Sequence, residues 1–399
     1  MRAATRLLPA FVLIAALAAG TPVTATPARA SAPRNAAASL SQRATTLAPG
    51  VTYRTYMASK STRVRLITVD LAQGATIDVA LARQELPGWA RTSAIAVAHN
   101  ALAAVNGDFG LPPGRPGHAL AQDGELIQTS VLGKKGKNFA VSIDGSGAHI
   151  GIPTQRITVT QPATGEVFTV DRWNGGAPGA GEIAGFTPAG GSVERPPAGC
   201  AVHLTPAGDP TWAASERGIG RDYSVDASAC GNAMGVGDGV VLVASLGGTE
   251  AQRLQALQAG DTVRLVWSFG WPMVLDSIGG NPLLVKNGQP VIGQCLTYLC
   301  RRNGRTAVGV TADGKVILVQ MDGRFGTPAG MTLATLAREM VRLGAVDALN
   351  LDGSGSSTMW IKGRGVVNQP SDGYERPVTT ALLVLPGLDP QDPPTLLPP

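Results

Sequence analysis

Short apolar runs rich in β-branched residues, separated by Gly, Pro and Asp-Gly, dominate the interior of this chain. Runs of this kind, bounded by turn-forming residues, are typical of β-strands. The predicted strands include residues 64–71, 76–82, 139–143, 156–160, 240–244 and 263–267. The pattern therefore indicates a fold in which strands dominate.

Three stretches have helical spacing instead, namely residues 89–101, 250–258 and 332–343. The last is the clearest, because apolar residues recur at positions 333, 336, 337, 340 and 341 and form one stripe. Thr332 is the predicted N-cap and Gly344 the predicted residue after the helix. A short apolar strand, 346–351, follows and stops at Asp352. Asp352 is thus expected at the carboxyl end of a strand, where sheet proteins often place sites.

The chain ends differ from the interior. Residues 1–30 combine Arg2 and Arg6, an apolar run from Leu7 to Ala19 and a small-residue end, which is the layout of a secretory signal peptide. The run is shorter than the roughly 20 residues of a membrane-spanning helix. We therefore expect cleavage after Ala30, a secreted extracellular protein and no stable membrane insertion. Residues 31–50 and the Pro-rich 386–399 are predicted to be flexible, and 51–385 to form the catalytic region.

Removal of the leader changes the charge balance. The whole chain has 33 basic and 28 acidic residues, and the leader holds three of the basic ones, so the mature chain is left with about two excess positive charges. Lys134-Lys135-Gly136-Lys137 is the longest basic run. Nucleic-acid binding needs more concentrated positive charge, so we exclude it as a function.

The four cysteines are Cys200, Cys230, Cys295 and Cys300. In an oxidising compartment they are expected to form disulfides, and the sequence-local pairing of Cys200 with Cys230 and Cys295 with Cys300 is preferred among three possibilities. A zinc site is the competing interpretation. It lacks ligands, because the four histidines are scattered singly and no Cys-x-x-Cys occurs. No metal and no cofactor is predicted.

Two β-rich runs, 305–312 and 315–322, flank Asp313-Gly314. This arrangement favours a two-residue type I′ hairpin. In that register Arg305 lies opposite Asp322, on the same face of the sheet, with Arg324 just beyond. The alternative is a surface salt bridge worth less than about 1 kcal/mol. A bulge that shifted the register by one residue would separate the pair.

The loop that follows Asp352 contains Gly353, Ser354, Gly355, Ser356 and Ser357. Its glycines let the backbone approach a ligand, its amides can form an anion-binding nest, and its hydroxyls can donate to sugars or phosphate. Gly/Ser stretches are more often flexible turns. This one lies between a predicted buried strand and Met359-Trp360-Ile361, which indicates that it is held in place.

Two other polar loops attract attention. Asn106 and Asp108 end a strand-like run, and could equally form a structural Asx-turn. A downstream loop concentrates amide, carboxylate and guanidinium groups, although such loops are usually just solvated; its members are Asn368, Asp372, Glu375 and Arg376.

Two common catalytic arrangements are excluded. No histidine follows the 353–357 loop and its spacing does not fit a nucleophile elbow, so a Ser-His-Asp hydrolase is not predicted. No Gly-x-x-x-x-Gly-Lys-Ser/Thr segment occurs, which excludes a P-loop.

Taken in order, six segments resemble the phosphodiester glycosidase family. They are 106–109, 279–288, 305–309, 322–324, 350–357 and 368–376, and the resemblance spans about residues 94–384. It implies an α+β fold of β-rich mixed sheets with a few flanking helices, and cleavage between the anomeric carbon of a sugar and a phosphate oxygen. The chain departs from the family pattern at Gly110, where an aromatic residue is common, and at Ser354, where a third glycine is usual. The first change is expected to open the sugar-binding wall, and the second to restrict the loop if that position needs a positive φ.

Glycosidic hydrolysis passes through an oxocarbenium-like state that needs a carboxylate, and a phosphate leaves already anionic. Asp352 is the predicted principal carboxylate and Asp322 the second, with Asp108 and Glu375 in reserve. The predicted substrate contacts are Asn106, Arg305, Arg324, Asn368, Asp372, Arg376 and the Gly353–Ser357 loop.

We therefore expect a secreted hydrolase whose partner is a carbohydrate or sugar-phosphate. Two alternatives stay open. One is a glycosidase that acts on a cell-wall glycan without phosphate. The other is a catalytically inactive polysaccharide-binding protein.

Overall fold

The computed structural model describes residues 44–132, 137–142, 147–191, 195–208, 213–215, 218–271, 274–293, 298–324 and 327–387. The predicted leader, Cys295, residues 134–136 of the basic run and residues 388–399 lie outside these ranges. Residues 44–50, expected to be flexible, include strand β1 (Thr45–Ala48), which pairs with β2 (Val51–Ser59). The paired part of the chain thus begins before residue 51.

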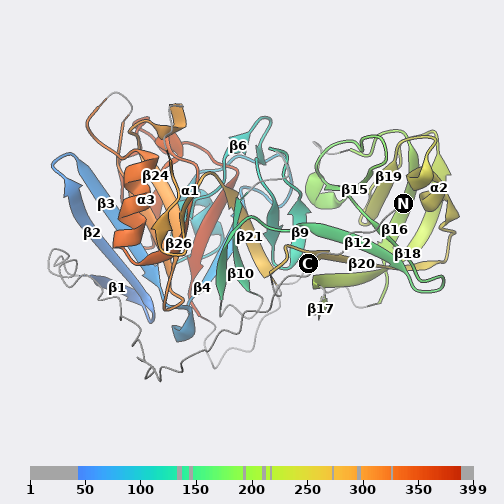
Figure 1. The fold of residues 1–399 in the computed structure, drawn as a ribbon, viewed down its shortest axis with the longest axis horizontal. Helices are drawn as coiled ribbons and strands as arrows, with labels where there is room; N and C mark the ends of the chain where they lie inside the picture. Colours follow the sequence, from blue (N-terminus) through green and yellow to red (C-terminus); the bar gives the residue numbers. More distant parts are fainter. Residues whose placement is uncertain are drawn as a thin grey trace, which may run out of the picture. The chain divides into compact units, whose positions relative to one another are not determined.

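Strands dominate the described residues, as predicted, and four sheets carry most of them (Figure 1). The first sheet has the order β1, β2, β3 (Thr62–Val69), β25 (Val316–Met321), β24 (Arg305–Thr311), β26 (Ala345–Asn350), β22 (Leu283–Lys286) and β23 (Gln289–Pro290). The second has the order β28 (Gly365–Val366), β27 (Met359–Ile361), β5 (Ala103–Asn106), β29 (Thr380–Leu385) and β4 (Thr76–Leu81).

The third sheet has the order β11 (Ala148–Gly151), β10 (Lys137–Ser142), β21 (Val274–Gly280), β8 (Leu120–Gln122) and β9 (Glu125–Gln128). The fourth has the order β13 (Glu166–Thr169), β12 (Arg156–Gln161), β20 (Thr262–Ser268), β18 (Gly218–Cys230), β16 (Cys200–Pro206), β19 (Val240–Ala244), β15 (Ile183–Phe186) and β14 (Arg172–Trp173), and β17 (Ala213–Ser215) pairs with β18. A short hairpin joins β6 (Gly110–Leu111) to β7 (Arg115–Pro116). Among the described pairs only β14 and β15 are parallel, so the fourth sheet is mixed, as predicted, whereas the described pairs of the first three sheets are all antiparallel.

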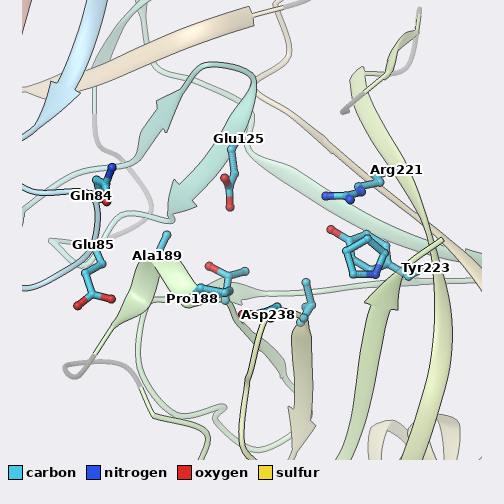
Figure 2. Close-up of a pocket in the computed structure, with 12 residues that line it drawn as sticks. Gln84, Glu85, Glu125, Pro188, Ala189, Arg221, Tyr223 and Asp238 are labelled. Carbon is cyan, nitrogen blue, oxygen red and sulfur yellow. The ribbon is translucent and has the colours of Figure 1, made fainter. Parts of the chain in front are cut away.

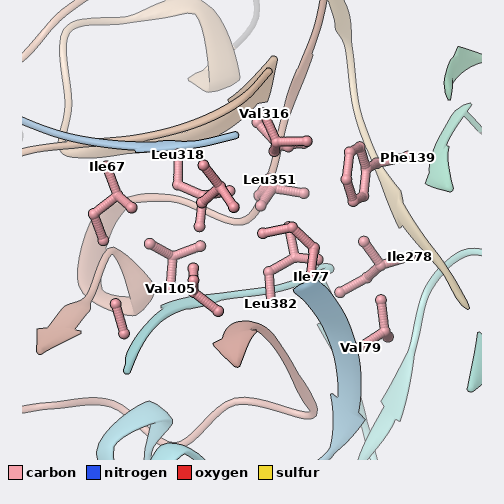
Figure 3. Packing of buried hydrophobic residues seen from close by; sticks show 14 of the residues in the cluster. Ile67, Ile77, Val79, Val105, Phe139, Ile278, Val316, Leu318, Leu351 and Leu382 are labelled. Carbon is pink, nitrogen blue, oxygen red and sulfur yellow. The ribbon is translucent and has the colours of Figure 1, made fainter. Parts of the chain in front are cut away.

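One hydrophobic core lies between the first three sheets (Figure 3). Ile67 and Leu318 come from the first sheet, Val105 and Leu382 from the second, and Phe139 from the third. All five side chains are almost fully buried. Burying an aliphatic side chain of this size stabilises the fold by about 1.5–3 kcal/mol. Helices cover the opposite faces of the first two sheets.

Each helix covers one sheet face. Helix α3 (Leu333–Arg342) packs its stripe on the first sheet, α1 (Thr92–Ala98) packs on the second and α2 (Thr249–Ala256) on the fourth. The predicted cap is confirmed, because the Thr332 side chain accepts a hydrogen bond from the Thr335 amide, and Gly344 has φ 95°. Helix α1 is shorter than predicted, since Ala90 bridges to Val378 before it and Asn100 has φ 52° after it. None of the described helices is long and apolar enough to span a membrane.

A disulfide joins Cys200 and Cys230, as predicted. The two residues face each other in the register between β16 and β18, with Cα atoms 4.0 Å apart. The other predicted pairing includes Cys295, which lies outside the described residues.

Candidate active site

Two strands from different sheets end side by side at the predicted site. Strand β5 ends at Asn106 and β26 at Asn350, and the residues that follow are hydrogen-bonded to each other. The Asp352 amide donates to the Gly107 carbonyl at 3.0 Å, and Asn106 Nδ2 donates to the Asp352 carbonyl at 2.8 Å. The backbone of Asp352 is therefore held from both sides by the Asn106–Asp108 turn.

Asp352 is a largely buried carboxyl group. Burial raises its pKa above the ordinary value, and the negative charge of Asp108 acts in the same direction. The Ser356 hydroxyl, the Gly353 amide and the positive charge of Arg376 oppose this rise. The Gly353 amide donates to Asp352 Oδ1 at 2.8 Å. A carboxyl group with a raised pKa exchanges protons nearer neutral pH, as general acid–base catalysis requires.

Asp108 and His118 form a buried pair beside Asp352. Asp108 is 1% exposed and His118 is 4% exposed, and His118 Nδ1 lies 2.7 Å from Asp108 Oδ1. The amides of Phe109 and His118 also donate to Asp108, each at 2.7 Å. Gly279 makes room for the pair, because a Cβ there would lie 2.1 Å from the His118 Cβ. The histidine is part of the site that sequence reasoning missed, since it carries no motif and was one of four scattered histidines.

Arg376 and Asp372 reach the site from the downstream loop. Arg376 Nη2 lies 2.6 Å from Asp372 Oδ2. The pair packs on Gly355, where a Cβ would lie 2.2 Å from atoms of both side chains. The positive charge of Arg376 also lowers the pKa of Asp352. The structure therefore brings the downstream loop and the loop that follows Asp352 together at one place.

The Gly/Ser loop forms the short 3₁₀ helix η4 (Ser354–Ser356). Ser354 has φ 57°, so the position where the family usually has glycine is indeed left-handed, and serine adopts it here. Several amides of the predicted nest already donate within the protein, namely those of Gly353, Ser354, Ser356 and Ser357. The hydroxyl of Ser357 is buried and has no hydrogen-bond partner among the described residues.

The predicted pairing of Arg305 with Asp322 is wrong. Arg305 faces Met321 instead, one residue away from the predicted register. The turn has three loop residues, because the Gly314 amide donates to the Thr311 carbonyl and Gly314 has φ 79°. Such a turn ends in a glycine bulge, which the two-residue type I′ turn lacks.

The two side chains have other partners. Asp322 Oδ1 lies 2.8 Å from Arg65 Nη1, on neighbouring strand β3. Arg305 is 3% exposed and donates to the carbonyls of Leu299, Arg301 and Met331. Burial lowers its pKa to about 10. Its Nη1 lies 3.9 Å from where a Cβ of Gly353 would stand, so the Arg305 side chain packs against the Gly/Ser loop at Gly353.

Asn106 and Asn368 form hydrogen bonds with backbone groups of the neighbouring loops. Asn106 Oδ1 accepts from the Thr306 hydroxyl at 2.7 Å and from the Thr358 amide at 3.0 Å. Asn368 accepts from the Met359 amide and donates to the Ser357 carbonyl, each at 2.8 Å. Both residues thus position the loops, and sugar binding by either stays a prediction.

Two further predicted residues lie apart from these contacts. Glu375 accepts hydrogen bonds from the amide and hydroxyl of Ser93, at 2.7 and 2.6 Å, and thereby caps the first turn of α1. The Arg324 side chain is exposed beside residues 325–326, which lie outside the described ranges. Their catalytic and binding roles stay predictions.

Trp89 occupies the place that Gly110 leaves open. Its ring carbons Cζ3 and Cη2 lie 2.5 and 2.6 Å from where a Cβ of Gly110 would stand. Trp89 Nε1 donates to the Pro113 carbonyl at 2.7 Å, and 39% of the residue is exposed. Gly110 is two residues from Asp108, a span of at most about 7 Å. The opening that Gly110 was expected to leave in the sugar-binding wall is therefore filled by the side chain of Trp89.

A group of three carboxylates lies outside this site. Oxygen atoms of Asp78, Asp123 and Asp276 are all within 4.8 Å of one another. Burial, followed by repulsion from Asp123, raises the pKa of Asp78 to about 7. A protonated carboxyl can donate to its neighbour, so the cluster can exist without a cation.

Comparison with known proteins agrees with the resemblance seen in the sequence. Residues 220–385 match the family model described as phosphodiester glycosidase. An uncharacterized SPbeta prophage-derived protein of Bacillus subtilis, YomE, is 33% identical over 103 residues, which is 25% of this chain and 16% of that protein.

Two solved structures share the fold. A hypothetical protein from Synechocystis has a TM-score of 0.63 and 22% identity, covering 84% of this chain and 62% of that one. A candidate exported protein from Burkholderia pseudomallei has a TM-score of 0.56 and 24% identity, covering 84% of this chain and 74% of that one. The alignments thus span only part of the length of these relatives.

Proposed function

We propose that this protein, whose residues 220–385 match the family model described as phosphodiester glycosidase, is a secreted hydrolase that cleaves the glycosidic bond of a sugar-1-phosphodiester or a related glycan linkage. One observation carries the proposal. Asp352 and Asp108 stand on hydrogen-bonded loops, and Arg376 acts on Asp352 from a third loop. Two carboxylates beside a cation suit a reaction that creates positive charge on the sugar and negative charge on the leaving group.

In the proposed reaction, water attacks the anomeric carbon while the bond from that carbon to the phosphate oxygen breaks. Asp352 takes the proton from the water, which its raised pKa favours. Asp108, held by His118, supplies negative charge beside the oxocarbenium-like state. The phosphate ester leaves with the bonding electrons and needs no proton.

The leaving phosphate is assigned to the positive side of the site. Arg376 is its main proposed contact, because its guanidinium already acts on Asp352. Arg324 is a further predicted contact. The 353–357 backbone was predicted as another, but the amides of Gly353, Ser354, Ser356 and Ser357 already donate within the protein. Arg305 is given a positioning role, since its guanidinium donates to three backbone carbonyls and packs against Gly353 of the Gly/Ser loop.

Export belongs to the same proposal. Its support is the leader-like N-terminal sequence and the disulfide between Cys200 and Cys230, because disulfides persist in oxidising compartments. The proposed substrate is accordingly an extracellular glycan, exopolysaccharide or sugar-phosphate.

A substrate panel tests the proposal. Wild-type protein is incubated with sugar-1-phosphodiesters and with aryl glycosides, and the products are read by NMR. Release of free sugar and phosphate monoester supports it. Cleavage of aryl glycosides that phosphate does not inhibit indicates a glycosidase for linkages without phosphate. Saturable polysaccharide binding without any product indicates a binding protein and overturns the hydrolase assignment.

A further inference from the structure

A cavity lies away from the residues of the candidate active site. It has a volume of about 420 Å³ and shares no lining residue with the Asp108, Asp352 and Arg376 group (Figure 2). Its walls come from the loop after β4, from β9, from the 3₁₀ helix η2 (Pro188–Gly190) and from strands β18 and β19 of the fourth sheet. A volume of this size falls in the usual range for small-molecule sites, roughly 300–1,000 Å³.

The lining is polar and mainly acidic. Glu85, Glu125 and Asp238 contribute three carboxyl groups, and Arg221 contributes the one guanidinium. Figure 2 shows Glu125 and Arg221 on separate strands, with Tyr223 beneath the arginine. Such a cavity disfavours phosphates and other anions, because the acidic groups outnumber the basic one.

Glu125 and Arg221 have capacity to bind a ligand. Among the ion pairs of the described residues, none joins these two side chains directly, although the charge of Arg221 acts on Glu125. Burial raises the pKa of Glu125. Arg221 Nε is buried and has no hydrogen-bond partner in the described part of the chain. An apolar ligand would leave the Glu125 carboxyl group desolvated and Arg221 Nε without a hydrogen-bond partner, which is costly.

A suitable ligand must therefore donate to the carboxylates, accept from the guanidinium and carry no negative charge. An ammonium group has three donors and no acceptor, whereas a hydroxyl group both donates and accepts. We propose that this cavity binds an amino sugar residue of a glycan, with its ammonium group at Glu125 and Asp238 and its hydroxyl oxygens at Arg221.

The remaining lining residues complete the binding site. Tyr223 provides a wall of the cavity, and the Arg221 guanidinium carbon lies 5.7 Å from its ring centroid, which fixes the direction of the arginine. Pro188 and Ala189 provide apolar surface for the face of a sugar ring. The site would hold a glycan independently of the chemistry at Asp352.

Binding of short oligosaccharides tests this inference without any assay of hydrolysis. The probes are a β-1,4-linked glucosamine tetramer, its fully N-acetylated counterpart and cellotetraose, titrated into the full-length mature protein and read by calorimetry. We expect the glucosamine tetramer to bind most tightly. Glu125→Gln and Arg221→Gln should each weaken it by about tenfold, the loss of one charge-assisted hydrogen bond.

Asp222→Asn is the matched control. Asp222 lies between Arg221 and Tyr223 on β18, so its side chain points to the opposite face, where Asp222 Oδ1 is 2.8 Å from Arg264 Nη1. This variant should bind like wild type. Asp238→Asn, at an exposed position, provides a second test should Glu125→Gln unfold.

Four outcomes would overturn the inference. The first is that no tetramer binds, and the second is that all three tetramers bind equally. The third is that binding of the glucosamine tetramer is unchanged in the Glu125, Arg221 and Asp238 variants. The fourth uses trilysine as an additional probe: if trilysine binds and the glucosamine tetramer does not, the cavity is a site for a basic peptide.

Discussion

His118 Nδ1 lies 2.7 Å from Asp108 Oδ1, in a pair of side chains that are almost completely buried. The histidine follows the β6–β7 hairpin and returns to the carboxylate ten residues further along the chain. Its ring, together with two backbone amides, directs the Asp108 oxygens and so determines where negative charge stands beside Asp352.

Replacement of this histidine should affect both stability and catalysis. His118→Ala removes one hydrogen bond to a buried carboxylate and should lower the free energy of unfolding by about 1–3 kcal/mol, measured by urea denaturation. Turnover should fall as well, because Asp108 is no longer held. His99→Ala, at an exposed position, is the control. Wild-type turnover in a folded His118→Ala protein would remove the pair from the mechanism.

Replacement of the principal carboxylate should separate catalysis from folding. Asp352→Asn keeps the shape of the side chain but removes its ability to take a proton, so kcat should fall by about 10²–10⁴-fold. The melting temperature should stay nearly unchanged, since the backbone of Asp352 carries the hydrogen bonds to Gly107 and Asn106. Full activity in Asp352→Asn would exclude this residue as the base, and an unfolded variant would make it structural.

The dependence of kcat on pH should show that the positive charge of Arg376 lowers the pKa of Asp352. Asp352 must be ionised to act as a base, and its pKa is raised, so kcat should fall with decreasing pH at values above the ordinary aspartate range. Arg376 lowers this pKa, hence Arg376→Gln should move the acid limb to higher pH. The measurement is kcat against pH for both proteins, with Arg364→Gln as the exposed-arginine control. An acid limb that stays in place or moves to lower pH contradicts the assignment.

Trp89 should contribute to substrate binding. Its exposed ring stands over Gly110, two residues from Asp108, where it can stack on a sugar bound at the carboxylates. Trp89→Ala should raise KM by about three- to tenfold with little change in kcat, and Trp89→Phe should restore much of the loss. Unchanged KM in the alanine variant would show that the ring does not contact substrate.

The three-aspartate cluster should make stability depend on pH. The pKa of Asp78 is about 7 in the folded protein, against an ordinary aspartate value of 3.8 for the unfolded chain, so the folded state binds the proton more tightly. Stability from this group is therefore present at low pH and lost as pH rises from about 4 to about 7. Asp78→Asn removes the penalty and should raise the free energy of unfolding at pH 8, by on the order of 2 kcal/mol, and much less at pH 4.5.

Urea denaturation at the two pH values measures this effect. Asp347→Asn is the control, because that aspartate forms an ion pair with Lys286 outside the cluster. An equal effect of Asp78→Asn at both pH values, or destabilisation at pH 8, would contradict the interpretation.

The residue pattern predicted local features well. The stripe of α3, its Thr332 cap and the left-handed Gly344 all follow from contacts within one or two helical turns. The question of a positive φ at Ser354 could be posed from the sequence, because the family usually has glycine there, and the structure answers it with φ 57°. Such properties depend on neighbouring residues and can be inferred without the fold.

The register of the β24–β25 hairpin could not be predicted from its own residues. Asp313-Gly314 suits both a two-residue turn and a three-residue turn ending in a glycine bulge, and the choice moves Arg305 by one position relative to Asp322. Strand β3 lies beside β25 and brings Arg65 to Asp322. A competing partner from another strand could not be anticipated from the hairpin alone.

The sequence by itself determined the strand-rich composition, the amphipathic helix, the disulfide between Cys200 and Cys230 and the loops from which the candidate site is built. Only the tertiary structure decided which polar residues in those loops face one another. It paired Asp108 with His118, hydrogen-bonded Asn106 and Asn368 to backbone groups of the neighbouring loops, and placed Trp89 over Gly110. The physical reason is that turn chemistry and apolar periodicity act over a few residues, whereas a site depends on strand register and on the packing of side chains distant in sequence.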